Sequence, residues 1–228
     1  MDCRKNFIEY LLMSIRKKKV VFFSIPIFFV GLIFFTSINS EKFLCLIAGG
    51  SDVPSKLHYW AIERMLILYD KGEDVGAPIL KALKSNEDNE IVDVYIKILG
   101  LIGEKEAIGY LNKVFIKALN THDPRGLTYP IVNSFGLMGN DEIVPFLEYL
   151  LENYKKFNIK ATKFSIARSL FLLTGNKYKY IKSNGSCGYF EPTRALVNAR
   201  DIIISSDNRR RTFEEMVALD KLFRPPEW

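Results

Sequence analysis

Lysines alternate with aromatic side chains through one stretch of the chain, residues 153–190. This stretch contains eight basic residues and no acidic one. Lysines neutralise anionic groups and aromatic rings stack on flat ones, so the combination is typical of an anion-binding surface. A patch that merely balances acidic residues of the same molecule is an equally good interpretation. The candidate binding residues are Lys155, Lys156, Lys160, Lys163, Lys177, Lys179 and Lys182.

Few residues are available for catalysis or metal binding. The 228 residues include three cysteines and two histidines, and none of them follows a metal-ligand spacing. Cys45 and Cys187 are candidates for a disulfide in an oxidising compartment. A nucleophilic Cys187 would need a base, whereas His58 and His122 are interpreted as surface or capping residues. We therefore expect no enzyme activity, no metal and no cofactor.

The formal charge of +6 is distributed unevenly. Residues 1–19 carry six basic and two acidic side chains, and residues 20–152 carry 11 basic and 17 acidic ones. The tail, 191–228, has seven of each sign. The net charge is therefore not a property of the whole surface, and by itself it does not indicate a nucleic-acid partner.

The N-terminal part contains a candidate membrane segment. Residues 20–38 include no charged side chain and are long enough to cross a bilayer core of about 30 Å as a helix. Arg16, Lys17, Lys18 and Lys19 directly precede it, which favours a cytoplasmic N-terminus. A cleaved secretory signal, giving a secreted protein, and a buried soluble helix are the alternatives.

This orientation predicts the location of each part of the chain. Residues 1–19 become a basic cytoplasmic N-terminus, 20–38 a single transmembrane helix in the cell membrane, and 39–56 a linker. Everything that follows is then extracytoplasmic, periplasmic or extracellular, where nucleic acid is not available. The remaining candidates for the basic stretch are an acidic protein, anionic lipid or an envelope polymer.

The central part of the chain repeats itself. Gly103, Gly139 and Gly175 are spaced by 36 residues (139 − 103 and 175 − 139), and Gly72 fits an earlier copy of the same pattern. A fixed period of this length indicates stacked units that cannot bury their apolar faces alone. Four residues before each of the three glycines stands a large apolar side chain: Leu99, Phe135 and Phe171.

Each unit is interpreted as a helical hairpin. Its first helix is mostly apolar and ends at the glycine, which can adopt the positive φ that turns the chain back. Acidic residues such as Asp74 and Glu104 then stand at the start of the second helix, where they favour the positive end of its dipole. The predicted fold is all-α: a short α-solenoid of about three to four hairpins over residues 57–182.

Two segments carry a family resemblance. LGLIGEKEAI (99–108) and FGLMGNDEIV (135–144) resemble the HEAT-repeat superfamily, in particular the short bacterial units of phycobilisome-lyase-like proteins. The resemblance implies a scaffold that binds proteins, and no lyase chemistry follows because no catalytic motif is present to receive it. A generic helical bundle with regularly spaced helices is the alternative.

The last unit departs from the pattern. After Gly175 the near-alternation KYKYIK, followed by Asn184-Gly185, indicates a small hairpin or ordered loop over 177–190. Residues 183–228 are interpreted as a loop and C-terminal helices that cap the open end of the stack, with a capping box at Thr212–Glu215. The alternative is a partner-docking tail in which Arg209, Arg210 and Arg211 and the terminal residues 223–228 are exposed.

The expected function is that of a membrane-anchored, non-enzymatic scaffold that binds a protein partner outside the cytoplasmic membrane. An immunity or inhibitor protein that sequesters a toxin or enzyme at the membrane is the alternative. Inhibition of a co-purifying enzyme would favour the immunity or inhibitor function over the scaffold.

Overall fold

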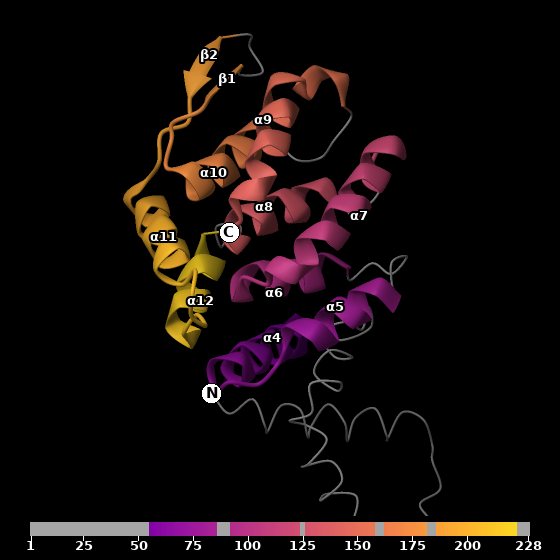
Figure 1. Ribbon diagram of the computed structural model, residues 1–228, viewed down its shortest axis with the longest axis vertical. Helices are drawn as coiled ribbons and strands as arrows, with labels where there is room; N and C mark the ends of the chain where they lie inside the picture. The colour runs from indigo at the N-terminus through magenta and orange to yellow at the C-terminus, as the bar shows by residue number, and fades with distance from the viewer. Residues whose placement is uncertain (1–54, 86–91, 124–125, 158–161, 182–185, 223–228) are drawn as a thin grey trace, which may run out of the picture. The chain divides into compact units, whose positions relative to one another are not determined.

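The computed structural model describes residues 55–85, 92–123, 126–157, 162–181 and 186–222 (Figure 1). The chain divides into two compact units, Met1–Met65 and Leu66–Trp228. In the first unit the structure describes only 55–65, which belong to helix α4 (Ser55–Asp70). The predicted segments 1–19 and 20–38, and nearly all of the linker, lie outside the described residues. Within the described residues, no helix has both the length and the apolar character needed to span a membrane.

The described part of the second unit is mostly helical, as the sequence predicts. The remaining elements, in chain order, are α5 (Gly76–Ser85), α6 (Val92–Ile102), α7 (Ile108–Asn120), α8 (Thr128–Met138), α9 (Val144–Glu152), α10 (Lys163–Thr174), β1 (Lys179–Ile181), β2 (Cys187–Tyr189), α11 (Arg194–Ser205) and α12 (Phe213–Lys221). Single 3₁₀ turns occupy Lys105–Ala107, Asp141–Ile143 and Tyr154–Lys156.

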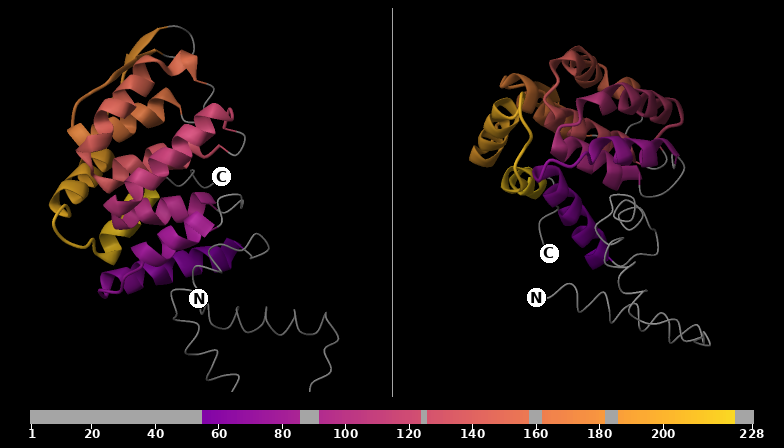
Figure 2. Two further views of the ribbon diagram at one scale, coloured as in Figure 1. Left: turned by 45° about the vertical axis from the view of Figure 1, so that its right-hand side comes forward. Right: turned by 60° about the horizontal axis from the view of Figure 1, so that its bottom comes forward.

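The apolar first helices lie side by side in the order α6, α8, α10, and α5, α7 and α9 each pack on the first helix that follows them (Figures 1 and 2). Burial of both faces explains why α6, α8 and α10 are apolar almost all round. Large side chains that this core buries without exposure include Ile79, Leu83, Ile96, Ile98, Leu99, Leu101, Leu111, Phe115, Phe135 and Phe190.

A contact between neighbouring first helices recurs along this row. The Ser134 hydroxyl donates 2.8 Å to the Ile96 carbonyl, and the Ser169 hydroxyl donates 2.8 Å to the Val132 carbonyl. Each serine lies against a glycine of the preceding helix: a Cβ at Gly100 would be 2.9 Å from the Ser134 Cα, closer than any side chain allows. The absence of a side chain therefore lets the two backbones approach, as small residues do elsewhere.

The turns after the first helices confirm the predicted glycine positions. Gly72, Gly103, Gly139 and Gly175 all have positive φ, between 70° and 99°. The starts of the second helices also follow the prediction in part, because Asp74 Oδ1 accepts from the Ala77 N–H at 3.2 Å. Before α9, however, the capping side chain is Asn140 instead of an acid.

The predicted hairpin after Gly175 is also confirmed. β1 and β2 pair antiparallel, with Lys179 opposite Tyr189 and Tyr180 opposite Gly188. The Asn184-Gly185 turn lies outside the described residues. The buried Phe190 ring follows β2 and packs 5.8 Å from the Phe171 ring, so an aromatic contact holds the hairpin on α10.

The C-terminal helices lie along the row. α11 packs on α10 and α12 packs on α6 (Figure 1), and the Lys97 ammonium of α6 is 2.5 Å from the Asp220 carboxylate of α12. Tail side chains also cover the three repeat glycines. A Cβ at Gly103, Gly139 or Gly175 would be 3.1, 2.7 or 2.8 Å from the nearest tail side-chain atom, which belongs to Arg211, Ile203 and Arg200 respectively.

Candidate binding cleft

The structure brings four of the predicted lysines around one cleft. Lys155, Lys156, Lys163 and Lys179 line a cleft of about 490 Å³ between the C-terminal part of α9, the start of α10 and the β1–β2 hairpin. These lysines come from three different elements, and only the fold of the last unit makes them neighbours. The other side chains lining the cleft are Glu148, Leu151, Glu152, Asn153, Tyr154, Tyr178, Tyr180 and Cys187.

Tyr154 and Tyr178 both line the cleft and contact polar neighbours. The Tyr178 hydroxyl donates 2.9 Å to Glu148 Oε1, which ties the hairpin to α9. The Lys163 ammonium lies 5.0 Å from the centre of the Tyr154 ring, within range of a cation–π interaction. Burial raises the pKa of both Tyr154 and Tyr178 above the usual value, so both phenols stay protonated and keep their donor.

The cleft lysines differ in their surroundings. Lys155 and Lys179 are exposed, and Lys156 donates 2.7 Å to the side-chain oxygen of Asn153. Lys177 does not line the cleft, and its ammonium pairs with Glu191 at 2.7 Å. Lys160 and Lys182 lie outside the described residues. The structure therefore places four of the seven predicted lysines together and assigns one of the others to an ion pair.

Cys187 stands at the start of β2 and is exposed at the edge of the cleft. Cys45 lies outside the described residues, so the disulfide remains a prediction. His122 is exposed in a turn with positive φ, next to the buried Asp123, whose carboxylate accepts from the Thr128 N–H and hydroxyl. Among the described residues, no group of three or more His, Cys, Asp or Glu side chains could hold a metal ion.

The arginines of the tail make contacts that the sequence interpretation missed. Arg211 is only 4% exposed, which contradicts the docking-tail alternative for this residue. Its guanidinium donates to the carbonyls of Gly100 and Leu101 at 3.0 Å and of Leu137 at 2.6 Å, and to the Ser206 hydroxyl at 2.9 Å. It thus satisfies the C-terminal carbonyls of α6 and α8 together. Burial lowers the pKa of Arg211 to about 10.

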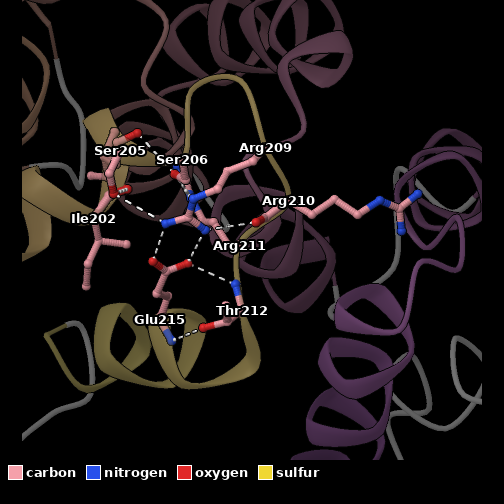
Figure 3. A network of polar contacts seen from close by, with 9 residues as sticks. Ile202, Ser205, Ser206, Arg209, Arg210, Arg211, Thr212 and Glu215 are labelled. Atoms are coloured by element: carbon pink, nitrogen blue, oxygen red, sulfur yellow. Dashed lines mark hydrogen bonds and ion pairs between the residues drawn. The ribbon is translucent and has the colours of Figure 1, made fainter.

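The two preceding arginines also have partners within the molecule, and Figure 3 shows the contact of Arg209 with Glu215. Arg210 extends to the end of α4, where it donates to the carbonyls of Tyr69 and Glu73 at 3.1 and 2.7 Å and lies 5.1 Å from the Tyr69 ring centre. Arg209 binds Glu215 through two hydrogen bonds of 2.8 and 2.5 Å. That glutamate closes the predicted capping box with Thr212, which is confirmed.

Comparison with known proteins gave no match: neither a family model, nor a curated protein, nor a solved structure matches this chain. The resemblance to HEAT repeats therefore remains a prediction from the residues.

Proposed function

We propose that this chain is a non-enzymatic binding protein built from HEAT-like helical repeats, which uses the lysine–tyrosine cleft to bind a protein partner. The observation that carries the proposal is the convergence of Lys155, Lys156, Lys163 and Lys179 with three tyrosines on one open cleft. Clefts that combine aromatic walls with a few polar groups are the usual place for recognition. Interfaces are also enriched in tyrosine.

The repeat architecture has independent support. The first helices lie side by side, the glycine turns recur every 36 residues, and the Ser134 and Ser169 contacts recur at equivalent places on successive helices. An α-solenoid is the arrangement in which each unit makes the same contact with the next. Solenoids of this kind present extended surfaces for proteins.

The test is site-specific cross-linking from native membranes. A photo-reactive side chain introduced at Tyr180, inside the cleft, should capture a partner, whereas the same group at Tyr110 on α7, which does not line the cleft, should not. Capture at neither position would contradict the proposal. A captured enzyme that loses its activity on binding would favour the immunity or inhibitor function instead.

We further propose that residues 20–38 anchor the protein in the membrane with the repeats outside the cytoplasm. The support is the uncharged stretch and its basic flank in the sequence. Protease added to cells with an intact cytoplasmic membrane, and with any outer membrane permeabilised, should then cleave within residues 60–228. Full protection in such cells together with cleavage in lysed cells would place the repeats in the cytoplasm and contradict this orientation.

A further inference from the structure

The hydrogen-bond pattern of the hairpin leaves one edge of β1 unpaired by β2. The Phe190 N–H donates 2.8 Å to the Tyr178 carbonyl, and Lys179 stands opposite Tyr189. In an antiparallel pair, hydrogen-bonded and non-hydrogen-bonded positions alternate. Lys179 is therefore at a non-hydrogen-bonded position, and its N–H and C=O point away from β2. An edge of this kind can accept an added strand.

This edge belongs to the strand that lines the cleft. β1 lies on the α9 side of the hairpin (Figure 1), and its residues Lys179 and Tyr180, with the preceding Tyr178, line the cleft together with residues of α9 and of the 3₁₀ turn Tyr154–Lys156. A chain entering the cleft thus meets β1 with its Lys179, together with Lys155 and Lys156 of the 3₁₀ turn and Lys163 of α10. The volume of about 490 Å³ accommodates a few residues of an extended peptide.

The charges of the cleft favour separate carboxylates over a dense polyanion. Four lysines face two glutamates, and Glu148 is already bonded to the Tyr178 hydroxyl. A closely spaced row of phosphates would meet the negative charge of Glu152, whereas single carboxylates along a peptide can avoid it. Lysine is also a mobile point charge without the fixed fork that arginine offers to phosphate.

We propose that the cleft binds an extended acidic segment of a partner protein, which adds as a third strand to the edge of β1 that β2 leaves unpaired and places its carboxylates against Lys155, Lys156, Lys163 and Lys179. This inference rests on the proposed function, because it names the chemistry of the partner at the same cleft. Backbone pairing would supply the alignment, and the lysines would select acidic side chains.

The experiment uses the purified full chain and a displayed random library of peptides about seven residues long. Selected peptides should be enriched in Asp and Glu, and their affinity should fall about tenfold or more for the K155E/K179E double variant. The matched control is Lys113→Glu, which reverses an exposed lysine on α7 outside the cleft and should leave affinity unchanged. N-methylation of the backbone along a selected peptide should weaken binding by a similar factor at one or more positions, because it removes donors needed for strand pairing.

Several results would overturn the inference. These are a selection without acidic enrichment, equal binding to the double variant, and insensitivity of every backbone position to N-methylation. Binding of the chain to phosphatidylglycerol vesicles, reduced in the double variant and not accompanied by peptide binding, would identify a lipid surface instead. The peptide selection needs no natural partner, so it is independent of the cross-linking experiment. Capture of a partner by cross-linking together with a failed peptide selection would contradict this inference and leave the proposed function standing. Failure of both experiments would contradict the proposed function and this inference together.

Discussion

Two basic clusters in this molecule carry the same sign of charge and use it differently. Arg209–Arg211 direct their guanidinium groups to backbone carbonyls and to Glu215, and Arg211 is buried. The cleft lysines come from separate segments and surround an open space. The difference lies in what the side chains reach: the tail guanidinium groups bond carbonyls at the ends of α4, α6 and α8, which a planar donor can satisfy, whereas the cleft lysines border an open space at the end of α9. A basic run is thus structural where its groups bond backbone carbonyls and available for binding where they border an open cleft.

The strongest test of this comparison is Arg211→Met. The substitution removes four hydrogen bonds and leaves buried carbonyls of α6 and α8 without that donor. We expect a loss of about 3–5 kcal/mol in the free energy of unfolding, measured by urea denaturation followed by circular dichroism. Lys113→Met, at an exposed position, is the control and should change stability by less than about 0.5 kcal/mol. Similar small losses for both would show that Arg211 is not structural.

Substitution of the cleft lysines should weaken binding and leave stability nearly unchanged. K155E/K179E reverses two exposed charges, so unfolding should shift by less than about 0.5 kcal/mol, while partner or peptide affinity falls about tenfold, or about 1.4 kcal/mol. Binding is measured by fluorescence anisotropy at two salt concentrations, and wild-type affinity should decrease as salt rises. A large loss of stability with intact binding would reverse the roles assigned to the two clusters.

Arg210→Ala should have an intermediate effect on stability. Arg210 is exposed, but it bonds the carbonyls of Tyr69 at the end of α4 and of Glu73 after it, and it lies over the Tyr69 ring. We expect a loss of about 1 kcal/mol, read from the same urea curves. Tyr69→Leu removes the ring. In a protein that already carries Tyr69→Leu, Arg210→Ala should therefore lower the free energy of unfolding by less than it does in the wild type. Full additivity of the two substitutions would show that the ring contact contributes nothing.

The smallest expected effect depends on pH. The hydrogen bonds from Arg209 hold the pKa of Glu215 below its usual 4.5. A carboxyl group with a lowered pKa in the folded state contributes stability above its unfolded pKa and loses it as the pH falls through the folded value. Glu215→Gln should therefore destabilise at about pH 7 and make little difference at about pH 2. An unfolding difference that persists unchanged at about pH 2 would indicate that the capping role of Glu215 needs no charge.

Much of the helical framework could be predicted because its signals are local. Gly103, Gly139 and Gly175 mark helix ends through their own φ, and the Thr212 capping box involves residues three positions apart. The alternation after Gly175 likewise predicts the short hairpin. Such features depend on backbone geometry within a few residues, which the sequence displays directly.

The contacts between residues far apart in the sequence could not be predicted in this way. Arg211 and the carbonyl of Gly100 are 111 positions apart, and the Ser134 and Ile96 partners are 38 apart. The unmet carbonyls at the ends of α6 and α8 are a general signal that some donor must arrive. Nothing in the sequence says which of the many basic side chains supplies it.

The sequence by itself determined the helices, their glycine turns and the concentration of lysines and tyrosines within 153–190, because each of these is a property of neighbouring residues. Only the tertiary structure decided which charges are used internally. It buried Arg211 between two helix ends and gathered Lys155, Lys156, Lys163 and Lys179 around one cleft. The physical reason is that the contribution of a charged side chain to stability or binding depends on the acceptors around it and on its exposure to solvent. Packing sets both, because it brings together distant parts of the chain.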